Sequence, residues 1–170
     1  MKFQRQFFNI ILLALGLVAG CQSFENTGKE LTSLRLHLEV FDDGTTFSTT
    51  VPIYRANPVK ITVESSSFAD ERDVELAQVI DWMGGYAIQL NLNRHGQWML
   101  ENITRGNLNR RIAVFAQFDK ESRWLAAPLI SHPIANGEIV FTPDASREET
   151  ERIVRGLNKV AAELKKKSHF

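Results

Sequence analysis

The feature that most constrains the fold of this chain is a two-residue alternation of apolar and polar side chains. In residues 34–40 every second side chain is apolar, beginning at Leu34, and residues 86–92 repeat the pattern. Successive side chains of a β-strand point to opposite faces, so this spacing predicts strands with one face buried and the other in water. The pair Gly84 and Gly85 before the second segment predicts a hairpin turn. The alternation therefore indicates an antiparallel sheet.

Shorter apolar runs predict further strands, and turn residues separate them. The sequence Asp42-Asp43-Gly44 predicts a hairpin turn after the first strand. Residues 69–77 favour a short helix, whereas residues 78–82 are equally compatible with a strand. The other segments with strand character are 47–53, 59–63, 112–118, 124–127 and 139–141.

The first of two predicted principal helices begins after Asn93, whose side chain is suited to cap free backbone amides. Its inward side carries Leu100 and Ile103, and it ends near Gly106 and Asn107. Helical spacing of the apolar residues predicts that this side packs on the sheet.

The last helix begins at a capping box in residues 146–149, where a serine and a glutamate three positions later bond to each other's backbone amides. Its apolar stripe consists of Ile153, Leu157, Val160 and Leu164. A glycine in mid-helix costs about 1 kcal/mol relative to alanine, so Gly156 is expected to lie in a close packing contact. These elements predict an α+β fold, with a mainly antiparallel sheet and two principal helices packed on one face.

The first 21 residues have the pattern of a bacterial lipoprotein signal. Lys2 and Arg5 precede an apolar run over residues 7–19, and the only cysteine of the chain, Cys21, follows directly on a short cleavage box. That box consists of Leu17, Val18, Ala19 and Gly20. Thirteen residues of helix reach about 20 Å, less than the roughly 30 Å of a bilayer core, so an uncleaved spanning anchor is the weaker alternative. We expect a signal peptide over residues 1–20 and acyl chains, palmitate among them, on Cys21.

Cleavage before Cys21 would leave a polar spacer, residues 21–32, and a single globular domain, residues 33–170. Loss of Lys2 and Arg5 from the 20 basic residues leaves 18 against 20 acidic residues, a formal charge of −2. This charge gives no reason to expect nucleic acid as a partner. Gln22 differs from the aspartate that resembles an inner-membrane retention signal, so the outer membrane of the cell envelope is favoured.

Between residues 51 and 164 a series of short motifs follows in order along the chain. The motifs are Ile88-Gln89-Leu90-Asn91-Leu92, Gly96, Leu100, Ile103-Thr104, Asn107, Arg111-Ile112-Ala113-Val114, Ala127-Pro128, Ile130, Ile134 and Gly137, with Asp73-Val74 and Ala77 upstream. This series resembles the head subdomain of the first periplasmic region of SecD, an accessory subunit of the bacterial protein translocase. The sequence departs from that family in the longer segment 113–128, in Asn109 where a glycine is usual, and in residues 139–142.

The resemblance implies a mobile, substrate-contacting module rather than an enzyme. Its partner would be another envelope protein or an exported polypeptide, and its membrane contact would be through the acyl chains on Cys21. Because the polytopic membrane part of such subunits is missing, the chain is not expected to pump. The resemblance also identifies six signature residues, namely Thr104, Asn107, Ala113, Ala127, Pro128 and Gly137. Their structural interpretation is that they cap a helix or end a strand.

The sequence contains none of the motifs that usually carry catalysis, a cofactor or a metal. The four histidines are scattered over the water-facing side of a strand, a helix start, a loop and the tail, and they are His37, His95, His132 and His169. Four acidic residues surround Arg72 in the sequence, namely Asp70, Glu71, Asp73 and Glu75. We favour a solvent-exposed face for them over a pair of catalytic acids or a cation site. We expect no metal and no cofactor.

The aromatic residues leave two interpretations open. Trp82, Tyr86 and Trp124 are more simply explained as core, whereas Trp98 lies beside the inward stripe of its helix and is compatible with partial exposure. An exposed indole would mark a binding surface. The sequence thus predicts a lipid-anchored, non-catalytic binding module, and a small-molecule-binding or hydrolytic lipoprotein with its site in a cleft is the alternative.

Overall fold

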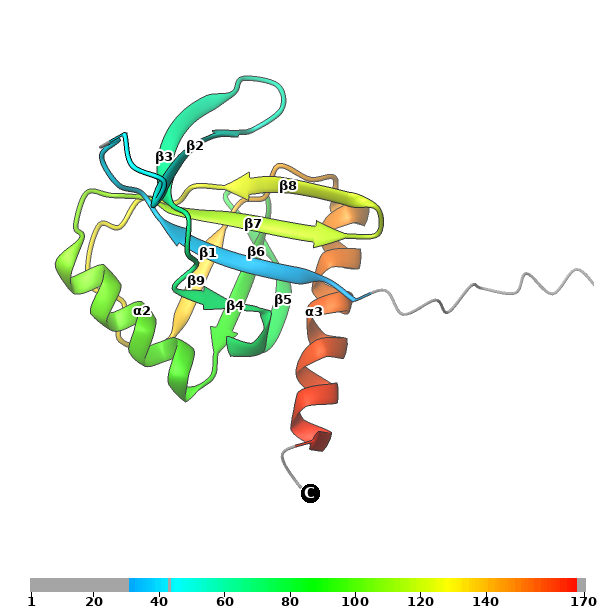
Figure 1. Cartoon of the computed structure of the whole chain (residues 1–170). Helices are drawn as coiled ribbons and strands as arrows, with labels where there is room; N and C mark the ends of the chain where they lie inside the picture. The colour runs from blue at the N-terminus through cyan, green and yellow to red at the C-terminus, as the bar shows by residue number, and fades with distance from the viewer. Residues whose placement is uncertain (1–30, 43, 168–170) are drawn as a thin grey trace, which may run out of the picture.

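The computed structural model describes residues 31–42 and 44–167 of the chain (Figure 1). The predicted signal peptide with its cleavage box, the predicted lipidation site Cys21 and most of the predicted spacer lie outside these residues, as do Asp43 and His169. Within the described part, none of the helices has the length and apolar character needed to span a membrane.

Short strands and two long helices make up the described chain. The strands are β1 (Ser33–Leu38), β2 (Ser48–Ile53), β3 (Val59–Glu64), β4 (Ala69–Asp70), β5 (Val74–Trp82), β6 (Gly85–Leu92), β7 (Ile112–Phe118), β8 (Glu121–Ala126) and β9 (Glu138–Phe141). The helices are α2 (Arg94–Gly106) and α3 (Arg147–Lys167), and a single 3-10 turn, η2 (Glu71–Asp73), joins β4 to β5.

The strands pair antiparallel throughout, in three separate sheets. One sheet has the order β4-β1-β7-β8, another has the order β5-β6-β9, and β2 and β3 form a hairpin of their own. In Figure 1, β1, β7 and β8 run side by side, with the β2–β3 hairpin above them. The predicted α+β class, the antiparallel pairing and the two principal helices are confirmed, although the strands do not form one continuous sheet.

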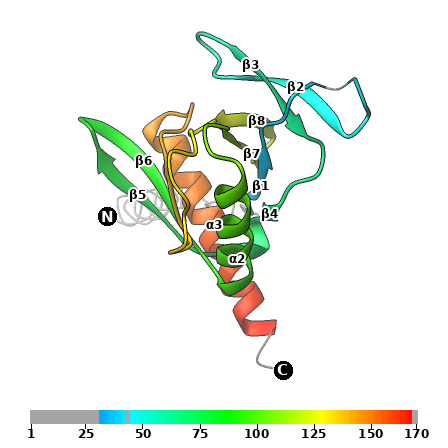
Figure 2. The ribbon, with the colours of Figure 1, turned by 90° about the vertical axis from the view of Figure 1, so that its left-hand side faces the viewer.

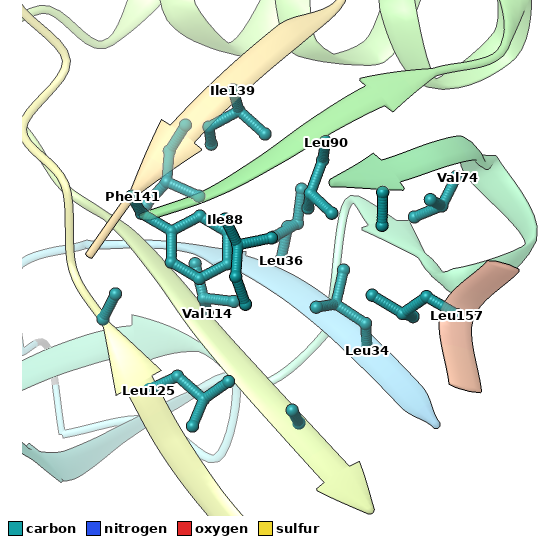
Figure 3. Close-up of a cluster of buried hydrophobic side chains, with 14 of the residues drawn as sticks. Leu34, Leu36, Val74, Ile88, Leu90, Val114, Leu125, Ile139, Phe141 and Leu157 are labelled. Atoms are coloured by element: carbon teal, nitrogen blue, oxygen red, sulfur yellow. The ribbon is translucent and has the colours of Figure 1, made fainter. Parts of the chain in front are cut away.

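The main core lies between the two larger sheets and the helices. Leu34 and Leu36 of β1 meet Ile88 and Leu90 of β6, and Leu157 of α3 closes the cluster (Figure 3). Each of these five side chains is fully buried. Burying one such leucine or isoleucine contributes about 1.5–3 kcal/mol, which explains why the two-residue alternation in β1 and β6 determines the inward face.

A second core cluster lies under the β2–β3 hairpin, on the opposite face of β1. It consists of Val51, Ile53, Ile61, Val63, Ala113 and Ala127, with Trp124 packed against it. His37 is buried with it, at 7% exposure, so the prediction that this side chain faces water is wrong. Its Nδ1–H donates to the carbonyl oxygen of Glu64 at 2.8 Å, and its ring lies edge-on to Trp124 with 5.1 Å between centroids. Burial lowers the pKa of His37 below its ordinary 6.5, and the Glu64 hydrogen bond opposes this only in part.

Two local predictions need correction, the hairpin turn at Gly44 and the short helix over residues 69–77. Gly44 does lie in a turn, with φ of 69° and its N–H donating to the Asp42 carboxylate. The turn is not a hairpin, however, because β1 pairs with β4 and β7 while β2 pairs with β3. Residues 69–77 form β4, η2 and the start of β5 rather than a short helix. Asp70 caps η2 through the amide of Arg72, and the chain turns extended again at Val74, where pairing with β6 begins.

The hairpin predicted at Gly84 and Gly85 and the helix cap predicted at Asn93 are confirmed. β5 and β6 meet at Gly84 and Gly85, with Trp82 opposite Gly85. Figure 2 shows this turn at the outer edge of the molecule. Asn93 accepts the N–H of Gly96, as an N-cap of α2 does.

The capping box of α3 forms as predicted. The Ser146 amide donates to the Glu149 carboxylate at 2.6 Å, and the Glu149 amide donates to the Ser146 hydroxyl at 3.2 Å. Burial alone would raise the pKa of Glu149, but the Ser146 hydrogen bonds and the Arg123 guanidinium, 2.7 Å away, outweigh it and lower the pKa to about 2.

The predicted close contact at Gly156 is made with Thr32. A Cβ on Gly156 would lie 2.2 Å from the Thr32 hydroxyl oxygen and 2.9 Å from its backbone nitrogen. Thr32, the last residue of the predicted spacer, is buried in this contact. α3 therefore holds the chain at the point where it enters β1.

Candidate binding groove

The candidate site is a groove beside β9, bounded on its other side by the connection from β8 to β9, residues 127–137. It has a cavity volume of about 600 Å³, which lies within the range of ligand-binding pockets. In Figure 1 this connection descends beside α2 before the chain turns into β9. The lining residues are Trp82, Ile112, Pro128, Leu129, Ile130, Ser131, His132, Pro133, Ile134, Ala135, Asn136, Glu138, Ile139 and Val140.

The start of β7 holds one end of the connection through backbone hydrogen bonds. The Ile112 amide donates to the Pro128 carbonyl at 3.0 Å, and the Ile130 amide donates to the Arg110 carbonyl at 2.8 Å. Since the proline nitrogen carries no hydrogen, Pro128 takes part only as an acceptor. This pairing fixes the wall of the groove that faces β9.

Helix α2 holds the other end of the connection, and Thr104 is the central residue. The fully buried Thr104 hydroxyl donates to the Leu100 carbonyl at 2.7 Å and accepts the Ile134 amide at 2.9 Å. Gln97 donates from Nε2 to the Ala135 carbonyl at 2.7 Å. The Thr104 hydroxyl is buried, and its hydrogen-bond donor and an acceptor site are both occupied by backbone groups. Thr104 therefore positions the groove wall and contacts no ligand directly.

The remaining signature residues lie in structural positions, some at the same wall and two in the second core cluster. Asn107 is the C-cap of α2 and donates from Nδ2 to the Ile103 carbonyl. Gly137 has φ of 74°, and a Cβ there would lie 3.0 Å from Cβ of Gln97, so both the conformation and the space favour glycine. Ala113 and Ala127 are buried in the second core cluster rather than in the groove.

The polar groups in the groove are few and do not form a catalytic arrangement. The Ser131 hydroxyl and Nδ1 of His132 are 2.9 Å apart, but the two are adjacent in sequence and exposed. Among the described residues, no carboxylate is hydrogen-bonded to His132 to orient its ring, as a triad requires. The described residues also contain no group of three metal-ligating side chains.

The predicted acidic face is partly buried, and its members tie elements together. Asp73 is buried and binds Nδ1 of His95 at 2.7 Å with one oxygen and the Asp70 amide with the other, so a solvated position for Asp73 is wrong. Glu71 accepts from the hydroxyl of Ser33 at the start of β1. The hydrogen bond from the Arg72 side chain lowers the pKa of Asp70. Because η2 lies between β1 and α2, these acids serve as structural anchors.

The aromatic residues divide between core and surface. Trp124 is half-buried against the ring of Phe115, with 5.2 Å between centroids. Trp98 is exposed on α2 outside the groove, and Trp82 lines the groove with 44% of its surface exposed, so the core interpretation of Trp82 is wrong. Beside it, Met83 at the hairpin turn is 92% exposed.

Sequence reasoning missed most of the groove-lining residues. Residues 129–136 have no strand or helix periodicity, so they read as an ordinary loop. The one available signal was composition, because Leu129 and Ile130 lie between two prolines, and Ile134 follows the second, in a segment that is apolar for a loop. Leu129 is 52% exposed at the groove.

No family model matches the sequence, and no curated protein matches it. The solved structures that are similar in fold include the following two. One is described as "Structure and function of a membrane component SecDF that enhances protein export", with 18% identity and a TM-score of 0.54 over 76% of this chain. The other is "Crystal structure of SecDF in Super-membrane-facing form", with 18% identity and a TM-score of 0.53 over the same share of this chain.

The chain spans only part of each of these proteins. It covers 63% of the first chain and 19% of the second. At this level of identity the likeness concerns the fold. The fold of this chain is thus that of a periplasmic region of SecDF, as the sequence motifs predicted.

Proposed function

We propose that this chain is a lipid-anchored module of the bacterial cell envelope that faces the periplasm and binds polypeptide without catalysing a reaction. Its anchor would be the acyl chains on Cys21, after removal of residues 1–20. The outer membrane is favoured, because Gln22 follows the cysteine. The fold likeness to a component that enhances protein export supports an exported polypeptide as the ligand.

The observation that carries the proposal is the character of the groove. Its lining residues are mostly apolar, although its exposed surface is about equally polar and apolar. Leu129 and Trp82 keep about half of their surface in water, and His132 and Glu138 are the lining residues with ionisable side chains. Exposed apolar surface of this kind is typical of protein interaction sites. Such a groove suits a segment of unfolded chain, whose apolar side chains are not yet buried.

The alternative is a small-molecule-binding or hydrolytic lipoprotein, and one observation favours it. The Ser131 hydroxyl and the His132 ring are in contact at the groove. Hydrolysis would require a third group that orients His132 and donors for the developing oxyanion. A serine-reactive fluorophosphonate probe that labels Ser131 would favour this alternative over the binding module.

The binding proposal can be tested with a photo-crosslinking amino acid at Leu129 in the full chain. The probe is reduced, carboxymethylated ribonuclease A, which cannot refold, and native ribonuclease A is its folded counterpart. We expect crosslinks to the unfolded form only. Val59, which is similarly exposed but lies on the β2–β3 hairpin, is the matched control position and should give none. Equal crosslinking at the two positions, or none to the unfolded form, would contradict the proposal.

The anchor needs a separate test, because binding and anchoring can fail independently. Cells are labelled with an alkyne fatty acid, and the wild-type chain is compared with Cys21→Ala. We expect label on the wild type alone, and sedimentation of that form with the outer membrane on a density gradient. Equal labelling of the two forms would end the lipoprotein proposal.

A further inference from the structure

We infer that the groove binds its polypeptide as an added β-strand, hydrogen-bonded to the free edge of β9. The inference rests on the proposed function, since it specifies how the polypeptide is held. It comes from the arrangement of backbone groups along β9 and from the charges that line the groove.

β9 is an edge strand, with β6 as its pairing partner in the three-stranded sheet. The Leu92 amide donates to the Gly137 carbonyl at 2.9 Å, and the register continues with Leu90 opposite Ile139. In an antiparallel pair, residues that bond to the partner alternate with residues whose N–H and C=O point away from it. The backbone groups of Ile139 therefore face β6, and those of Glu138 and Val140 face outward.

The outward groups of Glu138 and Val140 are not equivalent. The Glu138 amide donates to the side-chain oxygen of Asn136 at 3.1 Å, so the outward donor of Glu138 is already used. Within the described residues, neither the N–H nor the C=O of Val140 has a hydrogen-bonding partner. Val140 lines the groove, which places its donor and acceptor beside the open volume.

Unpaired strand-edge groups specify the chemistry of their ligand. An extended polypeptide is the ligand that supplies an acceptor and a donor at strand spacing, and peptide recognition by strand addition uses this complementarity. The four residues of β9 offer about 13 Å of edge at about 3.3 Å per residue, enough for a short extended segment. Glycans and small polar ligands have no such repeating pattern.

The side chains of the groove define the kind of segment. Every second side chain of an added strand would lie on the same side of the sheet as Val140, in the groove that Trp82 and Leu129 also line. Glu138 lies at one end of β9 and has no ion-pair partner among the described residues. We therefore expect a preference for an uncharged, β-branched segment with a lysine or arginine at the end that reaches Glu138.

The test uses a synthetic peptide with a lysine at each end, acetyl-Lys-Thr-Val-Thr-Val-Lys-amide, so that one lysine reaches Glu138 in either strand direction, and the same peptide with its two central residues N-methylated. Two consecutive N-methyl groups remove a donor from each edge of the peptide while its composition stays nearly the same. We expect the parent peptide to bind the full chain, and the N-methylated peptide to bind at least tenfold more weakly. Equal binding of the two peptides would overturn strand addition.

Amide exchange measured by NMR on the full chain gives an independent readout. Saturating parent peptide should slow exchange of the Val140 amide at least tenfold. The Ile139 amide, already bonded to β6, should change little. Unchanged exchange at Val140 with the peptide bound would overturn the inference.

Val140→Pro removes the outward donor, and edge strands tolerate proline where the lost N–H is not part of the ladder. Val140→Thr keeps the donor and the β-branched shape, so it is the matched control. We expect at least tenfold weaker peptide binding for the proline variant and less than a twofold change for the threonine variant. If the proline variant does not fold, the exchange measurement still decides.

Failure of this inference is distinguishable from failure of the proposed function. Crosslinking of unfolded ribonuclease at Leu129, together with unchanged Val140 exchange, would overturn strand addition and leave polypeptide binding in place. Absence of both signals would overturn both.

Discussion

The contact between Gly156 and Thr32 makes a prediction that runs against helix propensity. Alanine in place of a mid-helix glycine normally stabilises a helix by about 1 kcal/mol. At position 156, however, the new Cβ would lie 2.2 Å from the Thr32 hydroxyl oxygen and 2.9 Å from both its Cβ and its backbone nitrogen. Rotation of the threonine side chain could relieve only the first of these contacts, so either the backbone at residue 32 or α3 must move.

The expected magnitude follows from these two opposing effects. Overpacking in a close contact costs about 1–3 kcal/mol, and the involvement of a backbone atom favours the upper end of that range. Subtracting the propensity gain of about 1 kcal/mol leaves a net loss of about 2 kcal/mol in the free energy of unfolding for Gly156→Ala. For a domain of this size, that loss lowers the melting temperature by about 4–8 °C.

The matched control is Gly106→Ala, at the end of the other helix. A Cβ at Gly106 would have no neighbour within 4 Å. This variant should therefore be neutral or slightly stabilised. Urea unfolding followed by circular dichroism measures both variants. If Gly156→Ala proves as stable as Gly106→Ala, the close contact between α3 and the start of β1 is refuted.

Three further predictions concern the groove wall and two titrating groups. Thr104→Val leaves the Ile134 amide without its acceptor, so it should lower the free energy of unfolding by about 1–3 kcal/mol and weaken binding of the peptide probe. Thr104→Ser keeps the acceptor and should preserve both stability and binding. Equal behaviour of the two variants would contradict this role. The pKa of Glu149 is lowered to about 2 in the folded chain, so the unfolded chain binds a proton first as the pH falls. Stability should therefore decline from about pH 4.5 towards pH 2. In urea unfolding at stepped pH, Glu149→Gln should flatten that decline. The pKa of His37 is also lowered, so stability should fall as the pH drops through about 6.5; a His37→Gln variant with the same pH slope would refute this.

Local patterns in the sequence were sufficient for much of the fold. The alternation in β1 and β6, the Gly84-Gly85 turn, the Asn93 cap and the capping box of α3 all depend on residues within a few positions of one another. Each of these signals reports a backbone geometry that the neighbouring residues decide by themselves. The SecD-like motifs predicted the fold likeness for the same reason, because they record the order of such local elements.

Local patterns failed where a distant segment decided the outcome. Residues 69–77 have helical spacing, but pairing of Val74 with Leu92 of β6 draws them into a strand after one 3-10 turn. His37 lies on the polar side of β1, yet the β2–β3 hairpin covers that side. In both positions burial and pairing with another part of the chain outweigh a local preference of a few tenths of a kcal/mol per residue.

The sequence by itself determined most of the strands, the starts of both helices, the tight glycine at position 156 and the leader pattern with its single cysteine. The groove is a product of tertiary structure alone. Its wall is held by Thr104 bonding to Ile134, 30 positions away, and its free edge exists because β9 pairs on one side. A cavity is the space left between elements after they pack, and packing depends on the summed burial of many distant side chains, which no local stretch of sequence encodes.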